Sequence, residues 1–271
     1  MFRFFSTLFN RPTPKSPPYP PEAEEGTSRE GLIFISISLL FFSNCKKDNP
    51  FDCFTPSGKI ISETRSASAF HTIIIKDKMD IYLQQDSEYK IEVKAGKNII
   101  HNVITEVKNE TLYISNNNRC NFIRDPKKKT EVNISLPQLK YLKHTGSGNI
   151  YSINTFVQDT IIIRIESPGD VHLKVQTHYF VGSTHGNGDL YISGSTDLFY
   201  YNYNGTNFIY ADNLQIQQYA YLESHSVGHA FININNAGMD AALFSNGNIY
   251  YYGNPNYLNF HSKGKGKVIK K

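Results

Sequence analysis

Apolar and polar residues alternate with a period of two through residues 70 to 145. The apolar runs are short and polar turns separate them, as in "FHTIIIKD", "MDIYLQQD", "YKIEVKAG", "TLYISNNN" and "TEVNISLP". In "YKIEVKA", Ile91 and Val93 project to one side of an extended chain, and Lys90, Glu92 and Lys94 project to the other. This pattern predicts short β-strands with one buried face. The Asn-Glu pair within "KNETLYIS" predicts a hairpin turn between two of them.

From residue 146 onward the chain repeats itself about every twenty residues. Each unit starts at a small residue, and the successive steps between these residues are 21, 19, 18, 22, 19 and 19 along the series Gly148, Gly169, Gly188, Thr206, Gly228, Gly247 and Gly266. A unit with two short strands cannot close a core alone, so it must stack on its neighbours. The repeat predicts an all-β fold: a β-helix or β-solenoid with coils of about 20 residues, preceded by a shorter-strand β region packed on its start.

The second position after the small residue is apolar in every unit. We expect it to face the core, and it comprises Ile150, Val171, Leu190, Phe208, Ala230, Ile249 and Val268. Large side chains in such a column contribute roughly 1.5 to 3 kcal/mol each on burial, so Leu190→Asp should prevent folding. The unit at residues 205–210 is out of phase by one residue and has Thr206 in place of glycine, which predicts a bulge or a strained turn there.

The first position is polar in every unit and holds Asn149, Asp170, Asp189, Asn207, His229, Asn248 and Lys267. Asn and Asp side chains cap turns, and we expect the neighbouring glycines to supply positive φ angles. The alternative is functional: Asp170 and Asp189 would form a carboxylate pair on adjacent coils, as in β-helical glycosidases. That alternative needs a flanking basic or aromatic clamp.

The third position is predicted to face outward and is mostly aromatic. It holds Tyr151, His172, Tyr191, Ile209, Phe231, Tyr250 and Ile269. Aromatic rings about 4.8 Å apart on successive coils stabilise a solenoid by stacking. They also offer a platform for sugar rings or for a protein partner. The candidate binding face is therefore Tyr151, His172, Tyr191, Phe231 and Tyr250, with a structural role as the alternative.

The N-terminal segment has features of export. Residues 32–42, "LIFISISLLFF", have the length of a signal-peptide core and are too short to span a bilayer as a helix, which needs about 20 residues. The Pro-rich, acidic segment before them is not a typical signal-peptide start. Either the true start lies near residues 28–32, which we favour, or the signal is internal and weak.

The following "SNCKKDNPFD" resembles the lipobox and spacer of Bacteroidetes-type lipoproteins. That resemblance makes Cys45 the lipidated residue and implies an outer-membrane lipoprotein, anchored to the membrane by lipid. A buried N-terminal strand with an incidental cysteine is the alternative. We expect an unstructured leader and signal peptide at 1–44, a tether at 45–62 and the solenoid domain at 63–271. In an oxidising compartment Cys53 and Cys120 either pair or stay free thiols.

Composition and motifs narrow the functional classes. The net charge of +4 in 271 residues argues against a nucleic-acid partner. No metal-binding or nucleotide-binding signature occurs among the nine His and three Cys. We predict no catalytic residue, no metal and no cofactor. The triplet "DTI" at 159–161 resembles an O-glycosylation acceptor of Bacteroidetes, and three residues are a weak signal.

Several motifs in order resemble one bacterial family. They are "VKAGKN", "LYIS", "ISLPQLKYL" and the "GSG" that introduces Gly148, Asn149 and Ile150. From about residue 63 to the C-terminus the chain is similar to the putative autotransporter adhesin, head GIN domain family. The resemblance implies a β-helix-like fold and an exported, often lipid-anchored protein. The "DCF" around Cys53 and "NNRCNFIRD" around Cys120 are also similar to a lipoprotein subgroup, which favours a disulfide between them.

Three functions are compatible with these features. The first is a non-catalytic binding or adhesion module of the cell envelope, with a glycan or a surface protein as ligand. The second is a structural envelope component without a small ligand, which interacts through its ends or through the lysine-rich "KGKGKVIKK". The third is a carbohydrate-active enzyme on a β-helix, which needs converging acids and bases that the sequence does not show. We rank them in that order, and the oligomeric state is not predicted.

Overall fold

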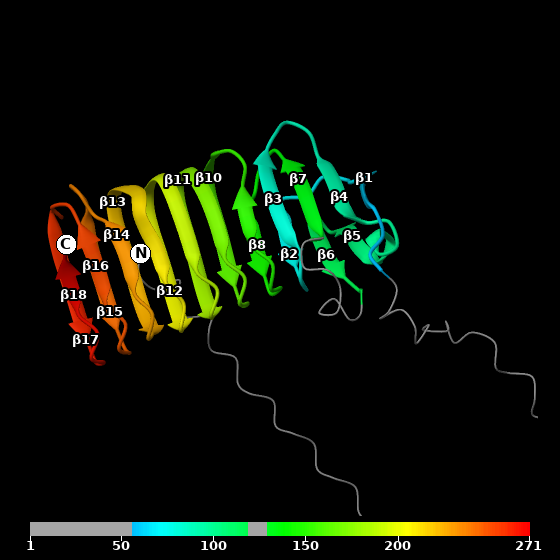
Figure 1. The fold of residues 1–271 in the computed structure, drawn as a ribbon. Coiled ribbons are helices and arrows are strands. Elements are labelled where there is room, and N and C mark those ends of the chain that lie inside the picture. Colours follow the sequence, from blue (N-terminus) through cyan, green and yellow to red (C-terminus); the bar gives the residue numbers. More distant parts are fainter. Residues whose placement is uncertain (1–55, 119–128) are drawn as a thin grey trace, which may run out of the picture. The chain divides into compact units, whose positions relative to one another are not determined.

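The computed structural model describes residues 56–118 and 129–271, which belong to one compact unit within Asp48–Lys271. The predictions for the leader, the signal peptide, Cys45, Cys53 and Cys120 lie outside the described residues. Within the described part the elements are strands and one short 3-10 helix (Figure 1). No helix of this part has the length and apolar character needed to cross a membrane.

The strands before the repeats are short. They are β1 (Ile60–Arg65), β2 (Thr72–Ile75), β3 (Asp80–Gln85), β4 (Lys90–Gly96), β5 (Val103–Lys108), β6 (Thr111–Asn116), β7 (Glu131–Leu136), β8 (Tyr141–His144) and β9 (Ile150–Ser152), with the helix η2 (Ile100–Asn102) between β4 and β5. The repeat region contains β10 (Phe156–Ile165), β11 (Val171–Gly186), β12 (Leu190–Gly205), β13 (Ile209–Ser226), β14 (Ala230–Asn233), β15 (Gly238–Leu243), β16 (Ile249–Tyr252), β17 (Tyr257–Ser262) and β18 (Val268–Lys270).

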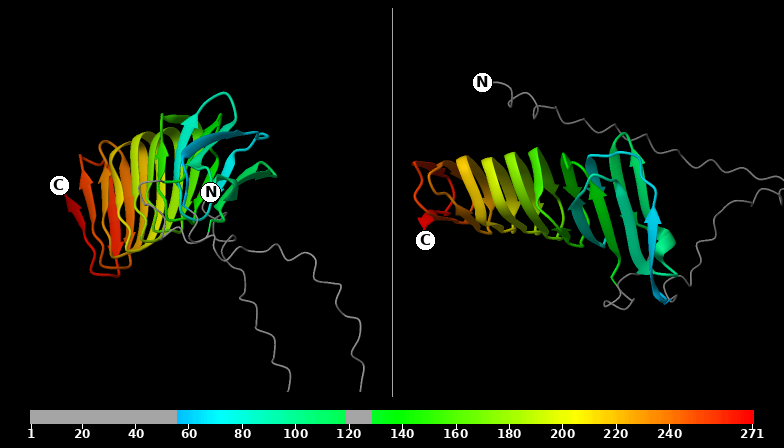
Figure 2. Two further views of the ribbon diagram at one scale, coloured as in Figure 1. Left: turned by 45° about the vertical axis from the view of Figure 1, so that its right-hand side comes forward. Right: turned by 90° about the horizontal axis from the view of Figure 1, so that it is seen from above.

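Parallel pairing between successive coils builds two stacks of strands, which enclose the core. Stack 1 contains β3, β9, the first halves of β11, β12 and β13, and then β14, β16 and β18. Stack 2 contains β2, β8, β10, the second halves of β11 to β13, and then β15 and β17. The turned views in Figure 2 show the coils following one another along one axis. The predicted β-solenoid is confirmed, with about seven turns of about 19 residues.

The register corrects one unit of the predicted repeat. Ile209, not Phe208, pairs with Leu190 and Ala230 in the inward column. Ile209 is 0% exposed, whereas Phe208 is half-buried. Consequently Tyr210, not Ile209, takes the outward position, and Asn207, not Thr206, takes the place of the glycine. The steps of the inward column become 21, 19, 19, 21, 19 and 19 along Ile150, Val171, Leu190, Ile209, Ala230, Ile249 and Val268.

The expected irregularity lies slightly further along the chain. Residues 204–205 keep the register of the preceding coil, and Gly205 has a φ of +113°, close to the +126° of Gly186 before it. The register shifts instead occur within β13, where extra residues are inserted opposite Ile192 and Asp197 of β12. These two β-bulges let β13 be two residues longer than β12.

The repeated glycines serve a different purpose from the predicted one. Their φ angles are not positive, in contrast to Gly186 and Gly205. A Cβ at Gly148 would lie 1.8 Å from the carbonyl oxygen of Met79, and one at Gly247 would lie 1.9 Å from that of Gly228. Glycine is therefore required because the backbones of neighbouring coils approach each other at this corner.

The first coils do not stack in chain order. In stack 2, β2 lies between β6 and β8, and in stack 1, β3 lies between β7 and β9. The β2–β3 coil is thus inserted between two coils that follow it in the sequence. Beyond β7 the sheet continues with antiparallel β4 and then β1, while antiparallel β5 follows β6. The β5–β6 turn has positive φ at Asn109 and Glu110, which confirms the predicted hairpin.

Candidate functional site

A ladder of stacked aromatic rings runs along the outside of stack 1. We call this set the aromatic ladder: Tyr82, Tyr151, His172, Tyr191, Tyr210, Phe231 and Tyr250. Neighbouring rings have centroids 4.3 to 5.6 Å apart and planes within 21° of parallel. The five residues of the predicted face all belong to it. The register of β3, β9, β11 to β14 and β16 places them, because each follows an inward residue of the core column.

Two members of the ladder were not predicted. Tyr210 was missed because the repeat was aligned on glycine, which shifted this unit by one residue. Tyr82 was missed because "MDIYLQ" precedes the repeat region and has no glycine. A three-residue pattern would have identified both of them. It consists of a polar or aromatic residue, a buried aliphatic residue and an aromatic or imidazole ring, as in Asp80-Ile81-Tyr82.

All rings of the ladder are half-buried. Their flat faces contact the rings above and below, so the ladder presents mainly ring edges and Tyr hydroxyl groups to solvent. The close packing also affects ionisation, since burial, with a smaller contribution from Asp189, raises the pKa of Tyr191 to about 12. Tyr191 thus remains a neutral hydrogen-bonding group at physiological pH.

Beside the rings, the Asn and Asp residues form a second ladder along the coils. Each side-chain oxygen accepts a hydrogen bond from the backbone N–H of the corresponding residue in the next coil. The donors Asn149, Asp170, Asp189 and Phe208 lie 2.7 to 3.1 Å from the Oδ1 atoms of Asp80, Asn149, Asp170 and Asp189 respectively. Further along, His229 Nδ1 accepts from Asn248, and Asn248 accepts from Lys267. We call this set the polar ladder.

The polar ladder gives Asp170 and Asp189 a structural task. The Oδ1 atom of each is occupied by a backbone N–H of the next coil. Burial raises the pKa of Asp189; the hydrogen bond from Phe208 opposes this rise, and the charge of Asp170 adds to it. Aromatic rings of the ladder flank the pair, and the contacts of both carboxylates in the polar ladder are hydrogen bonds to the backbone rather than to a basic side chain. The capping interpretation therefore accounts for both carboxylates.

Elsewhere the titratable groups are dispersed. Within residues 56–118 and 129–271, no group of three or more His, Cys, Asp or Glu side chains is placed to hold a metal ion. His144 is fully buried, its Nε2 lies 2.7 Å from the carbonyl oxygen of Gly148, and burial lowers its pKa. The cysteines predicted for lipidation and for the disulfide lie outside the described residues.

The fold and its ladders define a class: a β-solenoid whose coils are held together by an external aromatic ladder and a side-chain-to-backbone polar ladder. The chain belongs to the family described as "Putative auto-transporter adhesin, head GIN domain", whose model matches residues 69–255. This confirms the family that the sequence resembles. No curated protein matches the sequence.

Solved structures share the fold. A putative adhesin from Bacteroides fragilis is 24% identical with a TM-score of 0.74, and the match covers 80% of this chain and 99% of that one. A putative adhesin from Parabacteroides distasonis is 20% identical with a TM-score of 0.58, covering 79% and 98%. A third structure, described as a putative lipid binding protein from Parabacteroides distasonis, is 19% identical with a TM-score of 0.58, covering 79% and 97%.

Proposed function

We propose that this protein is an exported, lipid-anchored, non-catalytic adhesion module of the cell envelope. The observation that carries the proposal is the aromatic ladder, which forms one continuous outward surface on a rigid solenoid. Tyrosine edges and hydroxyl groups are frequent in protein interfaces, because they combine apolar area with hydrogen bonding at low entropic cost. The description of the family and of two solved relatives as adhesins supports the same function.

The structural alternative rests on the same rings. Stacking between coils at 4.3 to 5.6 Å stabilises the solenoid whether or not a partner binds. A structural ladder needs only the rings, whereas a binding face also uses the hydroxyl edge. Substitution by Phe therefore separates the two roles.

The test compares two triple variants at Tyr151, Tyr191 and Tyr250. The Phe variant keeps the rings and removes three hydroxyl groups, and the Ala variant removes the rings. Binding is measured on an array of extracellular-matrix proteins and cell-surface glycans, with unfolding followed in parallel. We expect the Phe variant to lose binding to the partner found with the wild type. It should lose the hydrogen bonds that Asn149 and Asn248 donate to Tyr151 and Tyr250, about 0.5–1.5 kcal/mol each, but it keeps the rings and should so stay more stable than the Ala variant. Ala at Tyr200, Tyr219 and Tyr257 of stack 2 is the matched control. Binding that survives the Phe and Ala variants alike would refute the ladder as the binding face.

The lipid anchor is a separate part of the proposal. The sequence around Cys45 supports it, and the described residues do not include this segment. Metabolic labelling with a palmitate analogue should label the wild type and not Cys45→Ser. Mass spectrometry of the mature N-terminus provides the second readout. A peptide spanning residues 12–29 in material from cells would contradict the expected start and cleavage. Fractionation then shows whether the protein resides in the outer membrane, and non-reducing mass spectrometry shows whether Cys53 and Cys120 are bonded.

A further inference from the structure

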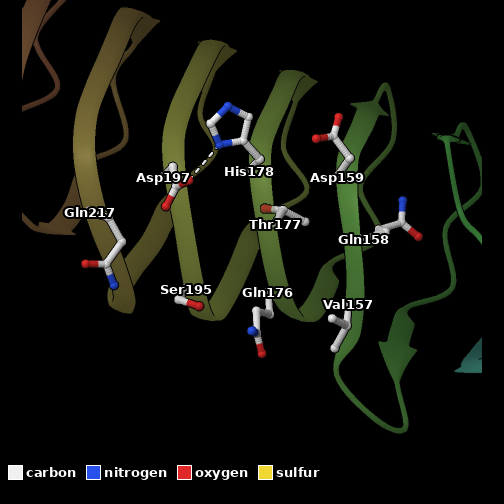
Figure 3. A pocket seen from close by; sticks show the side chains of 9 residues that line it. All are labelled: Val157, Gln158, Asp159, Gln176, Thr177, His178, Ser195, Asp197 and Gln217. Atoms are coloured by element: carbon white, nitrogen blue, oxygen red, sulfur yellow. Dashed lines mark hydrogen bonds and ion pairs between the residues drawn. The ribbon is translucent and has the colours of Figure 1, made fainter.

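A polar groove lies at the bend between the two stacks, away from the aromatic ladder. It has a volume of about 460 Å³ and is lined by residues of β10, β11, β12 and β13 (Figure 3). Parallel strands lie about 4.8 Å apart, so the groove extends roughly 14 Å from the first coil to the fourth. On β11 the bend comes four residues or more after His172 of the ladder. The groove and the ladder are therefore distinct surfaces.

One side of the groove is a row of residues in matching register. Val157 pairs with Gln176, and Gln176 pairs with Ser195. Val157 is 55% exposed and supplies an apolar contact at one end. Within the described part of the chain, the side chains of Gln176 and Ser195 have no hydrogen-bond partner. They are free to bind a ligand with both donors and acceptors.

The other side is a row that contains Asp159, His178 and Asp197 on successive coils, with Gln217 on the fourth. His178 Nδ1 lies 2.6 Å from Asp197 Oδ2; since a carboxylate only accepts, this nitrogen carries the hydrogen. The interaction orients the imidazole and leaves Nε2 free. Gln217 belongs to the second bulge of β13, which widens this end of the row.

The chemistry of the lining selects a ligand class. Among the described residues no Lys or Arg lines the groove, so this lining offers no charge complement for a phosphate or another anion. Most of the lining groups are neutral amides and hydroxyls. Both carboxylates already have a partner, because Thr160 Oγ1 donates a hydrogen bond to Asp159 at 2.6 Å and His178 Nδ1 donates one to Asp197. Each carboxylate keeps lone pairs that accept from hydroxyl groups. Tyr179 does not line the groove itself, but it is 37% exposed and its ring lies 4.3 Å from that of His178 in a T-shaped contact.

We infer that the groove binds a neutral oligosaccharide chain lying along the solenoid axis. Hydrogen-bonding groups of different kinds stand on successive coils at the strand spacing, which suits an extended polyhydroxylated ligand that crosses several coils. The amides of Gln176 and Gln217 and the carboxylates bind its hydroxyl groups, whereas backbone groups already hold the Gln158 amide. Tyr179, next to His178, packs against the apolar face of a sugar ring. This site goes beyond the proposed adhesion surface, because it uses none of the rings of the aromatic ladder.

Titration calorimetry with five neutral hexasaccharides tests the inference: cellohexaose, xylohexaose, mannohexaose, maltohexaose and chitohexaose. We expect at least one to bind the wild type. The double variant Gln176→Ala and His178→Ala should weaken that binding at least about tenfold, which corresponds to about 1.4 kcal/mol. Asn202→Ala, outward on the second half of β12, is the matched control and should stay within about twofold. If the double variant does not fold, Gln217→Ala alone is used and should weaken binding.

Three results would overturn the inference. They are the absence of binding by all five hexasaccharides, binding that the groove variants leave unchanged, and preferential binding of oligolysine, which would identify a cationic ligand. The Phe triple variant of the aromatic ladder should keep hexasaccharide binding. The proposal for the groove and the proposal for the adhesion surface can thus be refuted independently of each other.

Discussion

Replacement of Asp189 tests the polar ladder most directly, because this residue has two roles with opposite effects on the stability of the fold. As an acceptor, Asp189 Oδ1 pairs with the backbone N–H of Phe208 at 2.7 Å. As a charge, it is partly buried near Asp170, and burial raises its pKa. Asp189→Asn keeps the acceptor and removes the charge. Asp189→Ala removes both and leaves the Phe208 N–H without its partner.

The new amide nitrogen also has a partner within reach. Asn149 and Asn248 occupy the same column and donate from Nδ2 to the hydroxyl oxygens of Tyr151 and Tyr250 at 2.9 and 3.0 Å. Tyr191 stands at the same spacing from residue 189. One such hydrogen bond contributes about 0.5–1.5 kcal/mol. We therefore expect Asp189→Asn to raise the free energy of unfolding by about 1 kcal/mol near neutral pH, and Asp189→Ala to lower it by about 1–3 kcal/mol.

Urea unfolding followed by circular dichroism measures both effects, since the sequence has no Trp. The pKa of Asp189 is higher in the folded state than its ordinary value of 3.8, so the folded state binds the proton more readily than the unfolded chain does. The wild type should therefore gain on the Asn variant as the pH falls through the raised pKa, until only the contribution of the new hydrogen bond remains below about 3.8. Asp86→Asn, at an exposed carboxylate, is the control. Loss of stability in the Asn variant comparable to that of Ala, or an advantage that does not shrink between neutral pH and pH 3, would refute the reasoning.

Three further changes test other parts of the fold. Ile209→Asp should abolish folding, whereas Phe208→Asp should be tolerated, as judged by soluble expression and circular dichroism. If instead Phe208→Asp abolished folding and Ile209→Asp did not, the register predicted from the sequence would be the right one. Glu110→Gly should stabilise the protein by about 1 kcal/mol in thermal unfolding, since residue 110 has a φ of +56°, and a loss of stability would contradict the turn assignment. Because burial lowers the pKa of His144, its contribution is complete above the ordinary value of 6.5 and is lost as the pH falls below it, so stability should drop from neutral pH to about 5. The neutral variant His144→Gln should show a shallower slope, and an unchanged slope would assign the effect to other groups.

The coil could be predicted from the sequence because two structural requirements of a coil produce a recognisable pattern of residues. The inward column must be apolar, and the corner where backbones approach each other must be small. The prediction was wrong at residues 205–210 because the second requirement has another solution. Asn207 occupies the corner there and donates from Nδ2 to the carbonyl oxygens of Gly186 and Asn204. An alignment guided by glycine could not find it, whereas the ring of Tyr210 would have indicated the register.

The order of the first coils follows from information that alternation does not contain. A period of two shows which face of a strand is buried and does not show which strand lies beside it. The coils of β2–β3, β6–β7 and β8–β9 all have the same alternation, so the insertion of β2–β3 between the other two was not predictable. The choice depends on pairings between strands far apart in the sequence, and these are a property of the assembled chain.

The groove could not be predicted from the sequence for a related reason. Residues of the ladders recur at one position of every coil, so their period of about 19 residues is visible in the sequence. Gln176, Ser195 and Gln217 come from the bend of each coil, where polar residues are expected in any case and where the two bulges of β13 break the period. In a solenoid, selection for stacking acts on each coil alike and produces repeated columns. Stacking does not account for positions that depart from the repeat, so a site built from them, such as the groove, has to be found from the structure.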